Sequence, residues 1–86
     1  MDGIKAVLDI FDIPYDTADG VARVTVCGER EAYVENFISL EDYKKDNIKL
    51  KCKSFVVVIS GAEFKIKAIK ENSIMVSGKI ESIKFI

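Results

Sequence analysis

Apolar and polar residues alternate one by one along most of this chain, from about residue 21 to the C-terminal end. A period of two is typical of β-strands with one buried and one exposed face. Residues 55–59 are apolar without a break, which favours a central strand covered on both faces. The pattern therefore predicts an all-β fold. The alternating segments are 23–27, 32–38, 48–52, 64–68, 74–76 and 80–85, with turn-forming residues between them.

Short segments separated by turns leave little room for crossover helices between strands. We therefore expect mainly antiparallel short strands, arranged as a curved or stacked-hairpin ladder. Three of the expected strands end in a glycine, at Gly28, Gly61 and Gly78, and these glycines are 33 and 17 residues apart. Such spacing is compatible with a repeat of 17 residues stacked along one axis, and equally with a simple meander of similar strands.

The N-terminal residues follow a different pattern, in which apolar residues recur every three or four positions and share one face of a helix. Because Pro14 disfavours helical backbone at the residue before it, we expect one short amphipathic helix over residues 3–12. Its apolar face either covers one end of the β region, residues 21–86, or docks on a partner. Residues 1–86 together are expected to form a single domain. The apolar residues of the expected helix are Ile4, Val7, Leu8 and Phe11.

Aromatic and cysteine residues supply further candidates for the core. Phe55, Phe64 and Phe85 occupy apolar positions of their strands and are expected to be buried. Cys27 and Cys52 fall near the ends of alternating segments, where a free cysteine packs as a small hydrophobic residue. We therefore expect two buried or half-buried thiols, while a disulfide between them stays open because sequence does not give their distance.

Composition narrows the classes of function. Hydrophobic residues make up 49% of the chain and charged residues 31%, as in a folded domain rather than a disordered segment. The chain has no His, so it lacks the usual general base near neutral pH and the commonest metal ligand. Phosphate-binding loops, nucleophile elbows and metalloprotease motifs are absent too. We expect no enzyme activity, no cofactor, no bound metal and no small-molecule substrate.

Targeting signals are not evident in the sequence. The chain begins Met1-Asp2-Gly3, which is acidic where a secretory signal is basic. The longest apolar run has five residues, against about 20 for a helix that spans a bilayer. These features predict a soluble protein inside the cell, which a partner can still hold at a membrane.

The net charge of −1 is unevenly distributed along the chain. Residues 1–43 hold three basic and ten acidic side chains, whereas residues 44–86 hold ten lysines and four acidic side chains. Lysines that alternate with apolar residues predict a positively charged sheet face that binds an acidic partner, an anionic polymer or the acidic half of another copy. An ordinary strand face exposed to solvent has the same pattern, so both interpretations stay open. The candidate residues are Lys49, Lys51, Lys53, Lys65 and Lys67.

Nucleic-acid binding is not favoured by the distribution of residue types. The second half of the chain has no Arg, the residue that contacts phosphate and guanine through two parallel hydrogen bonds. Nucleic-acid binding also needs aromatic side chains on which bases can stack, placed among the Lys and Arg residues. Here Tyr33, Phe37 and Tyr43 lie in the acidic half of the chain. We keep a nucleic-acid or anionic-polymer binding module, built on the lysine-rich C-terminal half, as the alternative function.

Three stretches together resemble the YabP/YqfC family of sporulation proteins of endospore-forming Firmicutes, and more closely its YqfC branch. Residues 8–16 are similar to the family's N-terminal segment, which ends in a hydrophobic residue, Pro, any residue and Asp. Residues 23–28 followed by 33–36 are similar to its first strand and its Glu-Asn box. Residues 65–85 are similar to its ending, in which a strand with Gly continues into Ile-x-Phe.

The resemblance implies a structural or assembly role in endospore formation, in coat or cortex morphogenesis, without a reaction. It implies a protein partner, such as a membrane sporulation protein or a coat component, and leaves a homo-oligomer open. The expected location is the mother-cell cytoplasm, including the periphery of the forespore membrane or coat. By the family motif, Glu35 and Asn36 are candidate interaction residues. A purely structural interpretation has Asn36 in a turn or bulge and Glu35 paired with a neighbouring strand.

Overall fold

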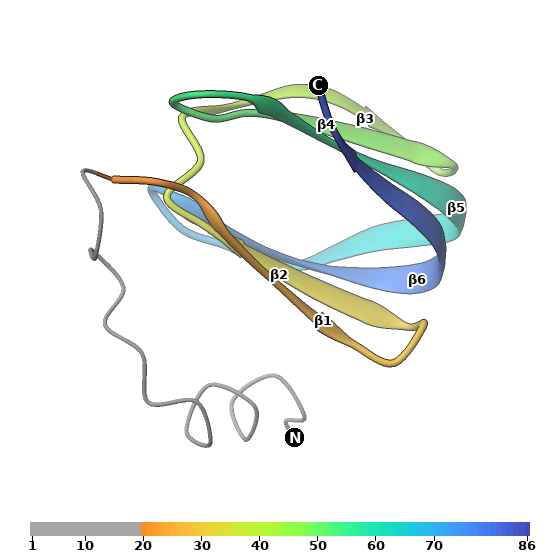
Figure 1. Ribbon diagram of the computed structural model, residues 1–86. Coiled ribbons are helices and arrows are strands. Elements are labelled where there is room, and N and C mark those ends of the chain that lie inside the picture. The colour runs from red at the N-terminus through yellow and green to blue at the C-terminus, as the bar shows by residue number, and fades with distance from the viewer. Residues whose placement is uncertain (1–19) are drawn as a thin grey trace.

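The computed structural model describes residues 20–86, which form one antiparallel sheet of six strands (Figure 1). Residues 20–86 contain no helix. The order of the strands across the sheet is β1-β2-β6-β5-β4-β3, so strands that are neighbours in the sheet are not always neighbours in the chain. The strands are β1 (Arg23–Cys27), β2 (Glu31–Glu35), β3 (Ser39–Lys44), β4 (Asn47–Lys51), β5 (Val56–Ile69) and β6 (Ser73–Phe85).

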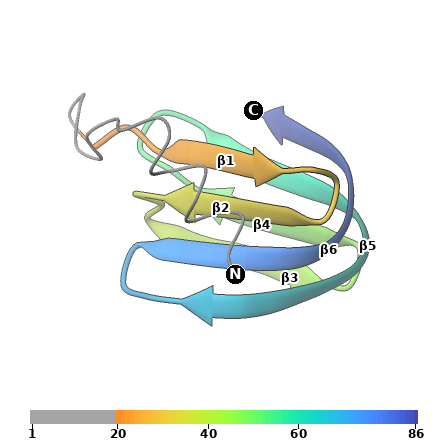
Figure 2. The same ribbon diagram turned by 90° about the horizontal axis from the view of Figure 1, so that it is seen from below.

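The sheet folds over itself because β5 and β6 bend near their middle (Figures 1 and 2). Residues 56–60 of β5 pair with β4 on one side and residues 57–62 with the second half of β6 on the other, whereas residues 65–69 pair with the first half of β6 alone. Residues 73–77 of β6 also pair with β2. Two facing layers result. The β1–β2 layer contains β1, β2, the first half of β6 and the second half of β5, and the β3–β4 layer contains β3, β4 and the remaining halves.

Two glycines allow the bend. A Cβ atom on Gly61 would overlap the backbone carbonyl oxygen of Lys79, and one on Gly78 would lie 2.8 Å from the carbonyl oxygen of Glu63. Gly78 also has a φ of 141°, a conformation that residues with a side chain rarely adopt. The pairing of β5 with β6 shifts register between Ser60 and Gly61, as expected where a strand changes direction.

The turns of the two outer hairpins hold the bend through backbone hydrogen bonds. In the β1–β2 turn, the carbonyl of Arg30 accepts a hydrogen bond from the N–H of Gly78 at 2.9 Å. In the β3–β4 turn, the carbonyl of Asp46 accepts one from the N–H of Gly61 at 3.1 Å, and that of Lys45 one from Phe64 at 2.8 Å. Both hairpins are therefore anchored to the same corner of the molecule.

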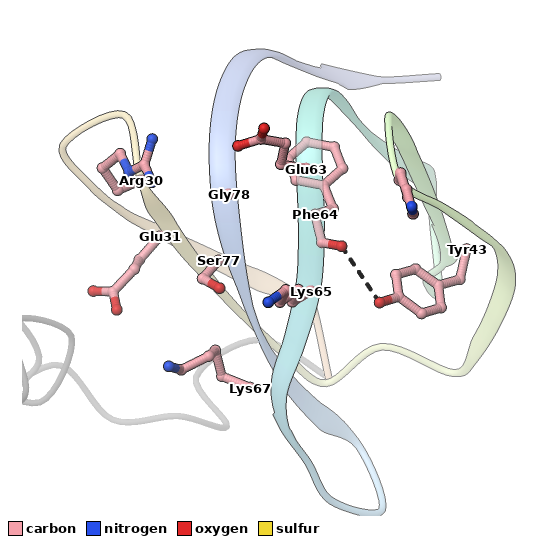
Figure 3. A pocket seen from close by; sticks show the side chains of 10 residues that line it. Arg30, Glu31, Tyr43, Glu63, Phe64, Lys65, Lys67, Ser77 and Gly78 are labelled. Carbon is pink, nitrogen blue, oxygen red and sulfur yellow. Dashed lines mark hydrogen bonds between the residues drawn. The ribbon is translucent and has the colours of Figure 1, made fainter.

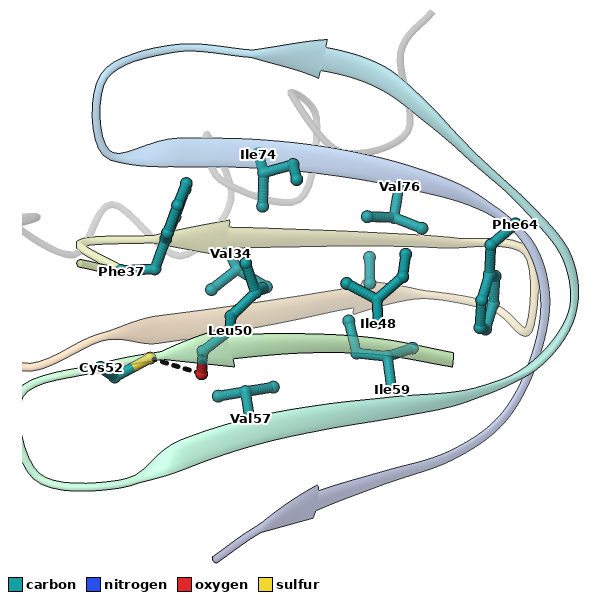
Figure 4. Close-up of a cluster of buried hydrophobic side chains, with 11 residues drawn as sticks. Val34, Phe37, Ile48, Leu50, Cys52, Val57, Ile59, Phe64, Ile74 and Val76 are labelled. Carbon is teal, nitrogen blue, oxygen red and sulfur yellow. Dashed lines mark hydrogen bonds between the residues drawn. The ribbon is translucent and has the colours of Figure 1, made fainter. Parts of the chain in front are cut away.

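The hydrophobic core lies between the two layers (Figure 4). Alternation along each strand directs every second side chain inward, so that β2, β4, β5 and β6 all contribute. Phe64 fills the corner and is only 2% exposed. The core residues are Ala32, Val34, Phe37, Ile48, Leu50, Cys52, Val57, Ile59, Phe64, Ile74 and Val76.

The all-β class predicted from the pattern is correct, but the expected ladder of short strands is wrong. β5 has 14 residues and β6 has 13, because the chain continues as a strand through glycines that look like strand ends in the sequence. Gly61 and Gly78 lie at one bend in neighbouring strands, whereas Gly28 lies in a turn, so the described residues do not form a stacked repeat. The expected helix over residues 3–12 falls outside the described residues.

Other predictions for the core are confirmed in part. The apolar run 55–59 does belong to a central strand, since β5 lies between β4 and β6. Phe64 is buried, but Phe85 is 57% exposed and its ring stacks edge-on against Phe55, with ring centroids 5.3 Å apart. Cys52 is buried and Cys27 half-buried, as predicted, and both are free thiols, so the disulfide that the sequence left open does not form.

Candidate interaction surfaces

The fold distributes the seven candidate residues over three separate places. Lys49, Lys51 and Lys53 belong to the β3–β4 layer, at β4 and the turn after it. Lys65 and Lys67 lie on the second half of β5. Glu35 and Asn36 lie at the end of β2. The sequence therefore predicts lysine-bearing strands correctly, but not a single lysine-rich face.

The first surface is the outer side of the β3–β4 layer. Ile48 and Leu50 of β4 are fully buried, so the alternate residues Lys49 and Lys51 point away from the core. Lys84 of β6 joins them, because Lys49 pairs with Val58 and Val58 pairs with Lys84. Sequence analysis did not connect Lys84 to this set, since only the pairing of β5 with β6 brings it there. We call this set, Lys49, Lys51, Lys53 and Lys84, the lysine face.

The second surface is an open groove of about 840 Å³ at the corner of the molecule (Figure 3). Tyr43 of β3 borders it, and the Tyr43 hydroxyl donates a 3.5 Å hydrogen bond to the carbonyl of Phe64. The two hairpin turns and β5 therefore bring an aromatic residue close to lysines that are distant in sequence. The charged residues that line the groove are Arg30, Glu31, Lys45, Glu63, Lys65 and Lys67.

The third place is the end of β2, where Glu35 is 7% exposed. The Nε of Arg23, on the neighbouring strand β1, lies 3.6 Å from Oε1 of Glu35. Within residues 20–86, no donor makes a hydrogen bond to that oxygen. Burial raises the pKa of Glu35 above its ordinary value, and the Arg23 guanidinium opposes part of this shift.

Asn36 turns the chain out of β2. It has a positive φ of 65°, which Asn tolerates better than most residues. Its N–H donates to the carbonyl of Asn72 at 2.7 Å and its side-chain amide to the carbonyl of Val21 at 3.3 Å. The structural interpretation of the Glu35–Asn36 pair is therefore confirmed; an interaction role for these residues stays a prediction.

Residues 20–86 show no group of three or more side chains of the kind that could hold a metal ion. Within the same part of the chain, no helix is long and apolar enough to cross a membrane. What the described surface offers is charge, exposed apolar side chains and strand edges.

Comparison with known proteins gives two similarities. The model of the YabP family matches residues 18–86. A protein of Bacillus subtilis (strain 168), named uncharacterized protein YqfC, is 31% identical over 75 residues, which cover 87% of this chain and 81% of that protein.

Proposed function

This chain belongs to the YabP family, and from that premise we propose that it is a non-enzymatic assembly protein of endospore formation that acts by protein–protein interaction. The family resemblance supports the sporulation role. The observation that supports the mode of action is the number of open strand edges on this small sheet.

Open edges arise in four places among the described strands. β1 and β3 end the sheet, and the second halves of β5 and β6 each pair with one strand. An open edge presents backbone N–H and C=O groups to which an extended segment of a partner can add as a further strand.

Two of these edges carry features that block such pairing. β3 has a register shift between Leu40 and Asp42, and the second half of β5 combines register shifts with Lys65 and Lys67. Bulges and edge lysines are the usual means by which proteins protect an edge. β1 pairs with β2 without interruption and exposes 43% of Val26, so we assign the partner strand to the β1 edge.

Along β1, backbone N–H groups point alternately toward β2 and away from the sheet, and this alternation gives a direct test of the assignment. Asn36 bonds to Asn72, the residue before β6, and Arg30 bonds to Gly78 of β6. By alternation, Tyr33 of β2 therefore bonds to Thr25 of β1, and the N–H of Val26 points outward. A proline at 26 therefore removes an outward donor, whereas a proline at 25 breaks a bond within the sheet. Val26→Pro is the edge-blocking variant, Val26→Ala its matched control and Thr25→Pro the destabilised comparison.

The experiment is genetic. Deletion of the coding sequence in an endospore-forming host should lower the number of heat-resistant spores, and Val26→Ala but not Val26→Pro should restore it. Urea unfolding of the purified variants checks that Val26→Pro remains folded. Unchanged spore numbers after deletion would contradict the sporulation role, and full restoration by Val26→Pro would contradict the β1 edge.

A second candidate function, binding of an anionic polymer or nucleic acid, is favoured by the groove. Tyr43 and four basic residues border one hollow there, which is the combination of aromatic and basic groups that sequence analysis did not find. Filter binding of single-stranded nucleic acid should then weaken steeply as salt rises, and Lys65→Gln with Lys67→Gln should reduce both the affinity and its salt dependence. Binding without salt dependence would exclude this function.

A further inference from the structure

Exposed apolar side chains gather at one end of the β3–β4 layer. Ile38 is 59% exposed, Phe85 57% and Ile86 70%, and half-buried Phe55 stacks on Phe85. Exposed apolar side chains that gather at one end of a small sheet mark that end as a candidate contact surface. We call these four residues the apolar rim.

Backbone pairing shows that the rim belongs to one end of the layer. The N–H of Ile38 donates to the carbonyl of Lys51 at 2.7 Å, and Val56 and Ile86 exchange hydrogen bonds at 2.8 and 2.9 Å. Lys51 pairs with Val56, which links the two sides. The start of β3, the end of β4, the start of β5 and the end of β6 therefore meet there.

The lysine face lies on the outer side of the layer and ends at this rim. Ile86 shares the outer side, whereas Phe85, which pairs with the buried Val57, projects to the core side, so the two surfaces meet at the end of the layer. Lys51 lies in the same row as Val56 and Ile86, and Lys53 follows in the turn. Lys49 and Lys84 lie two residues further along their strands, or about 7 Å at the usual rise of a strand. All four lysines therefore lie within about one Debye length, roughly 8 to 10 Å, of the rim.

Few acidic groups oppose these lysines on the outer side of the layer. Asp42 lies in the row of Lys49 and is 3.8 Å from Lys44, and Glu41 is exposed at the register shift of β3. Glu81 is exposed on β6, three residues before Lys84. None of the three lies in the row of Lys51, Val56 and Ile86 at the rim. The surface next to the rim is therefore positively charged.

We propose that the apolar rim and the lysine face together dock this protein on the surface of an anionic lipid bilayer. The rim side chains enter the boundary between headgroups and acyl chains, and the lysines meet the negative headgroups. The exposed apolar side chains come from the ends of separate strands rather than from a continuous groove, so they match a plane better than an extended peptide. This site lies on the layer opposite to β1 and does not depend on the proposed protein partner.

Vesicle flotation of the full chain tests the proposal. Vesicles of phosphatidylcholine and phosphatidylglycerol should bind the protein, vesicles of phosphatidylcholine alone should not, and salt should weaken the binding. Because each lysine near such a surface contributes roughly a fivefold effect, Lys49→Gln, Lys51→Gln and Lys84→Gln together should lower binding by about a hundredfold. Lys44→Gln, Lys70→Gln and Lys79→Gln make the same change of charge at exposed lysines that belong neither to the lysine face nor to the groove, and should leave binding unchanged.

The rim is tested separately with Phe85→Ser and Ile86→Ser, which replace exposed side chains and should not unfold the protein. These changes should reduce binding to anionic vesicles while leaving the binding of soluble polyglutamate as it is. Absence of binding to anionic vesicles at low salt would overturn the proposal, and so would an equal loss in the control lysine variant. Binding of polyglutamate as tight as that of vesicles, with rim variants unimpaired, would assign the site to a soluble acidic protein instead.

Discussion

At the scale of single residues, the contact between Arg23 and Glu35 joins the edge strand to the rest of the sheet. The carboxylate has little access to water, with its residue 7% exposed, and a guanidinium at 3.6 Å. Because burial outweighs the attraction to Arg23, the ionised form of Glu35 is less favoured in the folded protein than in the unfolded chain. A buried charge pair of this kind adds little net stability, because the cost of removing both charges from water offsets their attraction.

This residue gives the stability of the protein a defined dependence on pH. Because the pKa is raised, Glu35 in the folded state keeps its proton over a pH range in which the unfolded chain has already lost it. The free energy of unfolding therefore falls as pH rises from the ordinary pKa of 4.5 through the pKa of the folded state. Glu35→Gln removes this pH dependence. The free energy of unfolding of the variant minus that of wild type should therefore be larger at pH 7 than at pH 4.

Urea unfolding at the two pH values measures the effect. Glu71→Gln, which removes an exposed carboxylate from the β5–β6 turn, controls for the change in net charge. If this difference in the free energy of unfolding is instead smaller at pH 7 than at pH 4, the attraction to Arg23 outweighs the effect of burial on the pKa of Glu35.

At the scale of secondary structure, the length of β5 and β6 decides the architecture. A strand that runs through its glycine can bend from one layer into the other, which a chain of short hairpins cannot do. The local pattern around Gly61 is the same as that of a strand end. Only the carbonyl of Lys79, brought close by β6, distinguishes the two cases.

Gly61→Ala should therefore damage the corner itself. Its new methyl group would overlap the backbone of β6, and neither strand can move without breaking bonds to the hairpin turns. We expect a loss of about 3 kcal/mol or more in the free energy of unfolding. Gly28→Ala is the matched comparison, since Gly28 has a positive φ but open space around it, and it should cost only about 1 kcal/mol.

Urea unfolding of both variants checks this prediction. A loss for Gly61→Ala no larger than that for Gly28→Ala would mean that β6 moves aside and that its close approach does not require the glycine at the bend.

At the scale of the whole molecule, the two layers share β5, β6 and a single core (Figure 4). Neither layer can separate from the other without exposing the side chains that both bury. Unfolding should therefore be one cooperative event for residues 20–86, as is usual for small domains.

Hydrogen exchange measured residue by residue in mild denaturant tests this cooperativity. The slowest amides of β2 and of β4, one in each layer, should report the same free energy of opening. A lower value for one of the two strands would show that its layer opens by itself and that the bend is a hinge.

The sequence by itself determined the all-β class, because a period of two directs alternate side chains to opposite sides wherever a strand forms. It did not reveal β3, whose residues 39–44 lie outside the expected alternating segments. Local pattern was also sufficient for the central position of residues 55–59 and for the burial of the two thiols, although it left a disulfide between them open. The tertiary structure alone decided that Gly61 and Gly78 bend strands rather than end them, that Phe85 is exposed, and that Tyr43 meets Lys65 at one groove. These features depend on which strands become neighbours, and neighbours far apart in sequence leave no mark on the local pattern.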